Sequence, residues 1–193
     1  FEKEPITIQW IRDFKKNSVF FDVGANVGLY TIFAAIVSQS SVYSFEPESN
    51  NFQTLMENII LNNLIDKVNP YPIALSNDNA ITSLFLSSFE RGKSHHMVGD
   101  SLDHNLQQKT FKIKQGIFTT TIDDLIKKWN LPTPNYLKID VDGIENKIIE
   151  KSKKLLEDTK LHSVLIEINH NREKDKKIIK TFLNHGFIFD QKQ

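Results

Sequence analysis

The sequence lacks cysteine altogether. This absence excludes disulfide frameworks, cysteine-ligated zinc, iron–sulfur clusters and thiol nucleophiles. Long apolar runs are missing too, since no stretch approaches the roughly 18 residues that a membrane helix requires. The first residues show neither the basic region nor the apolar core of a signal peptide. We therefore expect a cytoplasmic protein without a membrane span.

The chain has no excess of charge of either sign. Its 24 basic side chains balance its 24 acidic ones, and the sequence pI is about 7.2. Domains that bind a phosphate backbone are usually strongly basic, so we expect no nucleic-acid partner. The 193 residues contain no linker and no internal repeat, which predicts a single domain over residues 1–193. No feature of the sequence indicates an oligomeric state.

Strand-like and helix-like segments alternate along the chain. Short apolar runs predict strands, and apolar residues at helical spacing predict helices between them. This alternation is typical of an α/β fold of the Rossmann-like, doubly wound kind, with a mostly parallel sheet and helices on both faces. Strands are expected at 18–23, 41–45, 68–74, 136–141, 163–168 and 186–190, and helices at 6–16, 27–38, 48–63, 121–129, 144–156 and 173–185.

Residues 79–118 interrupt the alternation. Two strand-like pieces, ITSLFL and FKIKQGIF, flank a long polar stretch, which predicts an inserted hairpin with a mobile loop after the third strand. The third strand itself carries two prolines, so it should be irregular or lie near an edge. Helical spacing assigns both Trp10 and Trp129 to the core.

Polar residues follow the predicted strands at their carboxyl ends. Ligands of open parallel sheets bind outside these ends, so the residues there are the first candidates for a site. We therefore expect an active cleft along this edge of the sheet. The segments concerned are Asp22-Val-Gly24-Ala-Asn26-Val-Gly28, Glu46-Pro47, Leu75-Ser76-Asn77, Asp140-Val-Asp142-Gly143 and Glu167-Ile-Asn169-His170.

The glycine loop after the first strand narrows the choice of ligand. Gly24 and Gly28 let a ligand approach the backbone, and Glu46 can accept both hydroxyls of a ribose. The dinucleotide fingerprint lacks its middle glycine, which is Asn26 here, and no Gly-Lys-Ser/Thr closes a P-loop. The loop instead fits a nucleoside ligand without phosphates, whose amino-acid end meets Asp22. That ligand is S-adenosylmethionine, with S-adenosylhomocysteine as its product.

The same segments resemble the FkbM-type methyltransferases, within the class I S-adenosylmethionine-dependent fold. The resemblance runs in order through FFDVGANVGLYTIFAA, VYSFEPESNNFQTLMENIILNN, YPIALSN, TTTIDDL, YLKIDVDGIENKIIE and VLIEIN. It implies O-methylation of a hydroxyl on a sugar, glycan or natural product. The family's fold normally ends in an antiparallel strand pair, of which this chain supplies only GFIFD. Because the chain also begins without Met, we expect terminal segments of the natural protein to be missing.

The resemblance further implies which residues contact the cofactor. The glycine loop would border its methionine part, Glu46 would hold the ribose, the end of the third strand would lie near the adenine, and the end of the fourth would form the reactive edge. Pro47, next to Glu46, is counted with the cofactor site. The predicted cofactor-binding residues are therefore Asp22, Gly24, Ala25, Asn26, Gly28, Glu46, Pro47, Ala74, Leu75, Ser76 and Asp140.

Transfer of a methyl group to a hydroxyl requires alignment of the acceptor and a group that takes its proton. The candidates are Asp140, Asp142, Glu145, Glu167, Asn169, His170, His95 and His96. We predict Asp140, Glu167 and His170 as catalytic residues. The first ends a strand, the second is a carboxylate in an apolar strand, and the third titrates near neutral pH.

Two side chains near Asp140 have further interpretations. Lys138 lies on the same face of its strand and could hold a buried carboxylate ionised. Asp142 equally matches the start of a helix, because Glu145 follows three residues later.

Several alternatives stay open at this point. The carboxylates of strands four and five could hold Mg²⁺, but no spacing fixes a ligand set, so no metal is predicted. A catalytically silent S-adenosylmethionine-binding module is one alternative function. An NAD-dependent oxidoreductase is another, which the missing middle glycine disfavours. The expected partner is a small-molecule or glycan-linked hydroxyl, whose identity the polar stretch 87–108 does not encode.

Overall fold

The structure is a computed structural model that describes residues 4–86, 91–92, 97–98, 113–168 and 172–190. Its centre is a five-stranded sheet in the order β3-β2-β1-β8-β9, in which every pairing is parallel. The order reverses between β1 and β8, which confirms the predicted doubly wound sheet. The strands are β1 (Val19–Val23), β2 (Ser41–Phe45), β3 (Val68–Tyr71), β8 (Tyr136–Ile139) and β9 (Ser163–Ile166).

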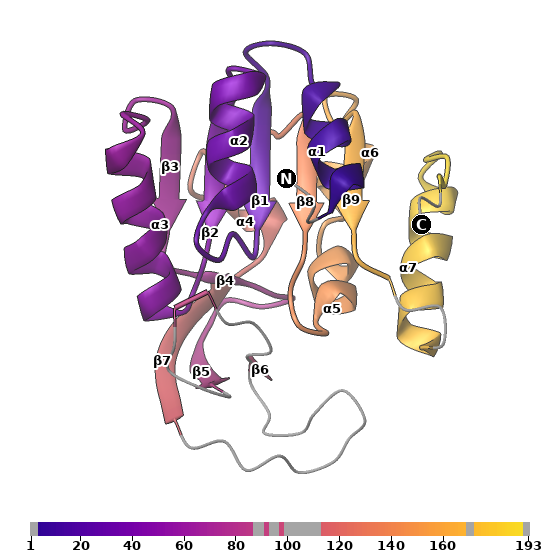
Figure 1. Cartoon of the computed structure of the whole chain (residues 1–193). Helices are drawn as coiled ribbons and strands as arrows, with labels where there is room; N and C mark the ends of the chain where they lie inside the picture. Colours follow the sequence, from indigo (N-terminus) through magenta and orange to yellow (C-terminus); the bar gives the residue numbers. More distant parts are fainter. Residues whose placement is uncertain (1–3, 87–90, 93–96, 99–112, 169–171, 191–193) are drawn as a thin grey trace.

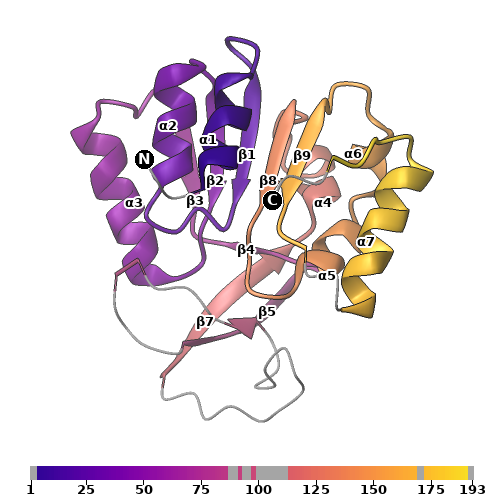
Figure 2. The same ribbon diagram turned by 45° about the vertical axis from the view of Figure 1, so that its right-hand side comes forward.

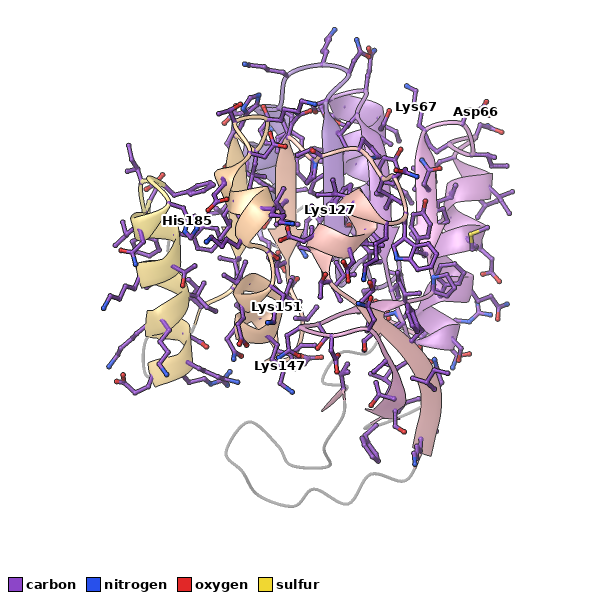
Figure 3. All side chains as sticks on the ribbon, turned by 180° about the vertical axis from the view of Figure 1, so that it is seen from behind. Asp66, Lys67, Lys127, Lys147, Lys151 and His185 are labelled. Atoms are coloured by element: carbon purple, nitrogen blue, oxygen red, sulfur yellow. The ribbon has the colours of Figure 1, made fainter. Side chains whose placement is uncertain are left out.

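Helices cover both faces of this sheet (Figure 1). Successive side chains of a strand point to opposite faces, so Phe20 and Phe21 of β1 enter two separate apolar clusters. The Phe20 cluster joins the sheet to α1 (Pro5–Arg12), α2 (Leu29–Val37) and α3 (Ser49–Leu61). The Phe21 cluster, on the face seen in Figure 3, joins it to α4 (Ile122–Lys127), α5 (Glu145–Glu150), α6 (Lys153–Glu157) and α7 (Glu173–Asn184).

A second, smaller sheet lies beyond the carboxyl ends of the parallel strands (Figures 1 and 2). Its order is β4-β7-β5-β6, from β4 (Ala74–Leu75), β5 (Ala80–Leu86), β6 (Met97–Val98) and β7 (Ile113–Thr120). β5 pairs antiparallel with β7 along its whole length, which confirms the inserted hairpin. The mobile loop predicted within it falls mostly outside the described residues.

Side-chain hydrogen bonds tie the small sheet to the connection between β2 and α3. The Gln115 amide of β7 donates to the Pro47 carbonyl at 2.6 Å, and its oxygen accepts from the Ser49 N–H at 3.1 Å. The Gly92 N–H donates to the Asn51 side chain of α3 at 2.7 Å. These bonds hold the insertion against the end of β2.

The structure corrects two predicted strands. Residues 68–74 do not form one strand, because β3 ends before Pro72, which has no N–H to donate, and Ala74 then pairs with Thr119 of the small sheet. The predicted edge position of β3 is confirmed. Residues 186–190 form no strand, and among the described strands β9 is the edge of the parallel sheet.

Two helix predictions are also wrong in detail. The helix expected over 144–156 divides into α5 and α6, because the Asp123 carboxylate accepts the N–H groups of Lys154 and Leu155 at 3.0 Å and so caps a new helix start. Trp129 is 58% exposed rather than in the core, since α4 ends at Lys127 and the helical spacing no longer applies. Trp10 does pack against the core, and its indole donates to the Ser163 hydroxyl at 2.9 Å. Within the described residues, no helix is long and apolar enough to cross a membrane.

Candidate active site

A cavity of about 340 Å³ opens where β1, β2 and β8 end. The strand order of the parallel sheet reverses at this place. Leu84 and Val98 of the small sheet form the opposite wall of the cavity. The cavity brings together most of the site residues that the sequence predicts. Those that line it are Gly24, Ala25, Asn26, Glu46, Pro47, Ala74, Leu75, Asp140 and Glu167.

The glycines of the loop after β1 serve close backbone packing. Gly24 has a φ of +81°, and a Cβ there would lie 2.0 Å from the carbonyl oxygen of Asp140. Its N–H donates to the carbonyl of Phe45 at 3.0 Å, so the loop is held between β2 and β8. Gly28, outside the cavity lining, has a φ of +88°, and a Cβ there would lie 2.4 Å from Leu55. The two glycines therefore let the loop and α2 lie against their neighbours.

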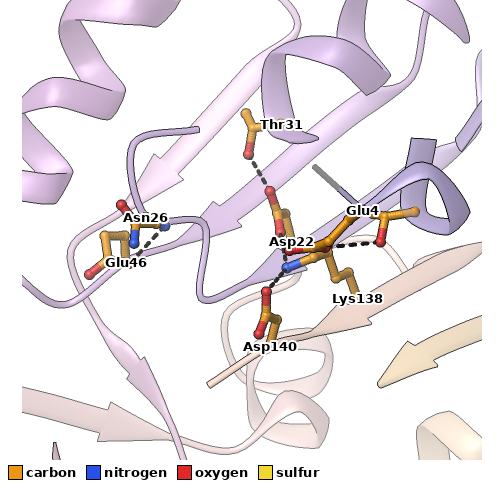
Figure 4. A network of polar contacts seen from close by, with 8 residues as sticks. Glu4, Asp22, Asn26, Thr31, Glu46, Lys138 and Asp140 are labelled. Carbon is orange, nitrogen blue, oxygen red and sulfur yellow. Dashed lines mark hydrogen bonds and ion pairs between the residues drawn. The ribbon is translucent and has the colours of Figure 1, made fainter. Parts of the chain in front are cut away.

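Glu46 is fixed to the glycine loop by its own carboxylate (Figure 4). One oxygen accepts from the Asn26 N–H at 2.8 Å and the other from the Glu48 N–H at 2.9 Å. Burial raises the pKa of Glu46 to about 7, and these two backbone bonds offset part of that effect. A carboxylate that is held rigidly and titrates near neutral pH thus faces the cavity.

Lys138 lies at the centre of a buried charge network (Figure 4). Its ammonium is 2.7 Å from the Asp140 carboxylate, 3.9 Å from that of Asp22, and 5.0 Å from the centre of the Tyr30 ring. Asp22 also accepts a hydrogen bond from the Thr31 hydroxyl at 2.7 Å. Burial raises the pKa of Asp22, and Lys138 partly offsets the rise. Asp22 does not line the cavity, so it is placed to act on the cavity only through Lys138.

The remaining predicted residues differ in how they relate to the cavity. Ser76 comes directly after the lining residue Leu75 but does not line the cavity itself. Its N–H donates to the carbonyl of Thr120 at 2.9 Å. Glu167 is exposed just beyond the end of β9, not within the strand as expected, because β9 ends at Ile166. The predicted His170, together with Asn169, His95 and His96, lies outside the described residues.

The helix-cap interpretation of Asp142 is wrong. Asp142 lines the cavity, and the residue in the cap position of α5 is Ile144, whose side chain makes no capping bond. The Glu145 carboxylate instead accepts the Gly143 N–H at 3.1 Å. Burial raises the pKa of Glu145 to about 7, but this side chain does not line the cavity.

Among the lining residues that sequence reasoning missed are Glu4 and Tyr30. Tyr30 is in the first turn of α2, two residues after Gly28, so its position directly behind the glycine loop could have indicated it. Glu4 precedes α1 and reaches the cavity only because α1 packs beside β8 and β9, which no local pattern reveals. In the part of the chain that the structure describes, no group of three or more histidine or acidic side chains is arranged to hold a metal ion.

Replacing Asp140 with asparagine should lower turnover without unfolding the domain. The substitution would keep the side chain's size but remove the charge that Lys138 binds at 2.7 Å at the edge of the cavity. We expect a fall in kcat of about 100-fold, as for loss of a group that positions a reactant. Turnover and the urea midpoint of the purified variant measure the two effects separately. Wild-type turnover in this variant would contradict a role for Asp140.

Ligand affinity should depend on the ionisation of Glu46. A carboxylate accepts both hydroxyls of a ribose, whereas a protonated carboxyl must itself donate. Because the pKa of Glu46 is about 7, we expect the affinity for S-adenosylhomocysteine to rise by up to about tenfold per pH unit below that value and to level off near pH 8. Calorimetric titrations at pH 6, 7 and 8 test this. Glu46→Gln should bind weakly at every pH, and a variant that kept the wild-type pH dependence would contradict the assignment.

The stability of the ligand-free protein should show the opposite trend. The pKa values of Glu46 and Glu145 are both about 7 in the folded chain, against 4.5 for an ordinary glutamate. The folded state therefore binds more protons than the unfolded state between these values, and its stability falls as the pH rises through about 7. We expect the melting temperature to drop by about 5 °C between pH 5.5 and pH 8, and by less in Glu145→Gln. A constant melting temperature would show that neither carboxyl is perturbed.

The fold and the cavity together define a class I, Rossmann-like methyltransferase fold. Solved structures share it: a methyltransferase FkbM from Methylobacillus flagellatus KT has a TM-score of 0.61 and 17% identity, covering 89% of this chain and 38% of that one. A precorrin-6y C5,15-methyltransferase from Geobacter metallireducens GS-15 has a TM-score of 0.54 and 12% identity. The match covers 95% of this chain and 70% of that one. The family model described as a methyltransferase FkbM domain matches residues 22–189. The chain therefore belongs to the FkbM methyltransferase family.

Two curated proteins are similar in sequence. The hexuronic acid methyltransferase AglP of Haloferax volcanii is 24% identical over 159 residues, which cover 82% of this chain and 59% of that protein. Methyltransferase 1 of Beauveria bassiana is 27% identical over 151 residues, which cover 72% of this chain and 60% of that protein. The chain thus spans about three fifths of the length of each of these relatives.

Proposed function

We propose that this chain is an S-adenosylmethionine-dependent O-methyltransferase whose acceptor is a hydroxyl of a sugar, a glycan or a natural product. One observation carries the proposal. A single cavity joins the anchored Glu46 carboxylate at the end of β2 to the Asp140 carboxylate at the end of β8, with the glycine loop between them. The family supports methyl transfer, and the name of the Haloferax volcanii relative supports an acceptor of the sugar type.

The lining residues suit the parts of S-adenosylmethionine. Glu46 would accept the ribose hydroxyls, Ala74 and Leu75 would offer an apolar surface to the adenine, and backbone groups of residues 24–26 would contact the methionine end. Three predicted residues would act without lining the cavity. Asp22 would fix Lys138 and Gly28 would fix α2. Ser76 would fix the start of the small sheet. When bound, the cofactor supplies a methyl carbon that its sulfonium activates.

The chain must also hold the acceptor and remove its proton. Lys138 fixes the Asp140 carboxylate at the edge of the cavity, where it can orient a hydroxyl. The pKa of Glu167 is raised, first by partial loss of solvation at the cavity edge and then by nearby carboxylates, so Glu167 accepts a proton more readily than an ordinary glutamate. We therefore propose Asp140 as the orienting group and Glu167 as the proton acceptor. His170 stays a further candidate for the second role.

Transfer of labelled methyl groups from S-adenosylmethionine tests this function. The acceptors would be a panel of glycosides and hydroxylated metabolites, each paired with its deoxy analogue. We expect label in at least one hydroxylated acceptor and none in its deoxy partner. Label only in amines would contradict O-methylation. Binding of S-adenosylhomocysteine without transfer to any acceptor would favour the silent binding module instead.

A further inference from the structure

The loop between β8 and α5 supplies one wall of the candidate site. Gly143, in the middle of this loop, does not line the cavity, and its φ is +94°, a conformation that glycine adopts readily. The residue in the cap position of α5 makes no side-chain capping bond. The path of the loop therefore depends largely on side chains that hold it from outside. The loop residues that line the cavity are Asp140, Val141, Asp142 and Ile144.

Both backbone polar groups of Gly143 are engaged. Its N–H donates to the Val141 carbonyl at 2.8 Å and to the Glu145 carboxylate at 3.1 Å. Its carbonyl accepts a hydrogen bond from the Lys174 ammonium of α7 at 2.6 Å. A hydrogen bond from a charged donor is roughly twice as strong as one between neutral groups. The bond from Lys174 therefore restrains the loop from a helix that lies outside it.

This bond connects the two segments that carry the proposed orienting group and the proposed proton acceptor. Asp140 begins the loop after β8, Glu167 directly follows β9, and α7 is the next described helix after Glu167. α5 and α7 are in contact and lie side by side (Figures 1 and 2). Lys174 thus joins the loop that begins with Asp140 to the helix that follows β9.

Lys174 differs from the neighbouring lysine of the same helix. Lys176 forms an ion pair with Glu173 on the surface of α7, and such exposed pairs contribute little to stability. The half-buried Lys174 instead donates to a backbone carbonyl next to the residues that line the cavity. Lys174 does not line the cavity itself, so its influence on the candidate site acts through Gly143.

We propose that Lys174 is a positioning residue for methyl transfer: by holding the Gly143 carbonyl, it keeps Asp140 where that carboxylate can align the acceptor hydroxyl with the methyl carbon. The inference rests on the proposed function. Lys174 contacts neither the cofactor nor the acceptor. A displacement of about 1 Å in an aligning group can lower a rate by about 100-fold, so a small shift of the loop is enough to matter.

Two cofactor analogues test this role without knowledge of the acceptor. In sinefungin, a carbon that bears an amine replaces the sulfur and its methyl group, so the amine takes the place of the transferred methyl group and can meet Asp140. S-Adenosylhomocysteine has no group at that place. By calorimetry at pH 8, we expect Lys174→Met to bind sinefungin about tenfold more weakly than the wild type does, because the Asp140 carboxylate is displaced from the amine. Its affinity for S-adenosylhomocysteine should stay close to that of the wild type.

Matched variants make the result specific. Lys174→Arg keeps a charged donor and should restore most of the affinity for sinefungin, whereas Lys176→Met removes the same charge from the same helix and should leave both affinities unchanged. The inference is overturned if Lys174→Met binds sinefungin as the wild type does, if it loses affinity for both analogues equally, or if Lys174→Arg restores nothing. Failure of S-adenosylhomocysteine to bind the wild type would instead overturn the proposed function.

Discussion

Gly24→Ala is expected to destabilise the domain by about 4 kcal/mol or more. The new Cβ would lie 2.0 Å from the carbonyl oxygen of Asp140 and 3.0 Å from its carbonyl carbon. Both are backbone atoms of the residue that follows β8, so no side-chain rotation relieves the clash. The positive φ of Gly24 adds strain for any residue with a Cβ. β1 and β8 would have to separate at the point where the cavity forms.

Gly116→Ala is the matched control. Gly116 lies in β7, its φ is not positive, and a Cβ there would meet no atom within 4 Å. We expect the urea midpoint of this variant to equal or slightly exceed that of the wild type, since alanine restricts the unfolded chain. Equal midpoints for the two variants would contradict the close approach of Gly24 to Asp140. If Gly24→Ala folds, its affinity for S-adenosylhomocysteine should still fall, because Asp140 is displaced.

Lys138→Met should have the next largest effect. Lys138 and Asp22 have side chains only 3% and 1% exposed, so removal of the ammonium leaves a fully buried carboxylate without its cation. Loss of one partner from a buried ion pair typically costs about 3 to 5 kcal/mol. The Asp140 carboxylate, 2.7 Å from the ammonium, loses its anchor at the same time. We expect a lower urea midpoint together with a loss of turnover.

A second substitution separates these two consequences. Asp22→Asn removes the buried charge, and its side-chain oxygen can still accept the hydrogen bond from the Thr31 hydroxyl. The double variant Asp22→Asn/Lys138→Met should therefore regain most of the lost stability but none of the lost turnover, because Asp140 is still unanchored. Recovery of turnover in the double variant would show that Lys138 acts only on Asp22. Wild-type stability in Lys138→Met would contradict the buried network.

The sheet could be predicted from the sequence because its signals are local. The strands at Val19–Val23 and Ser41–Phe45 are short apolar runs, each followed by a polar end, and their boundaries differ from the predicted ones by at most one residue. The division of residues 68–74 between two sheets depends on the pairing of Ala74 with Thr119. That pairing joins distant parts of the chain and leaves no trace in the local pattern.

The candidate site shows the same limit. Glu46 and Asp140 were predicted because each directly follows a strand, and both line the cavity. Lys138 was predicted as a partner of a buried carboxylate from its place two residues before Asp140; its ammonium lies 2.7 Å from Asp140, which is part-exposed, and 3.9 Å from the buried Asp22. Glu4 was missed because its position depends on how α1 packs against β8 and β9. Residues that end a strand could therefore be predicted, and residues brought in by helix packing could not.

Calorimetric titration of the purified protein with S-adenosylhomocysteine, and separately with NAD, at pH 8 tests the central claim most directly. At this pH Glu46 is ionised, since its pKa is about 7. The account predicts saturable binding of S-adenosylhomocysteine at one site, strongly weakened in Glu46→Gln, and no binding of NAD. Asp66→Asn, which removes a carboxylate before β3 and outside the cavity lining, should bind as the wild type does. Binding of NAD alone, or S-adenosylhomocysteine affinity that Glu46→Gln leaves unchanged, would contradict it.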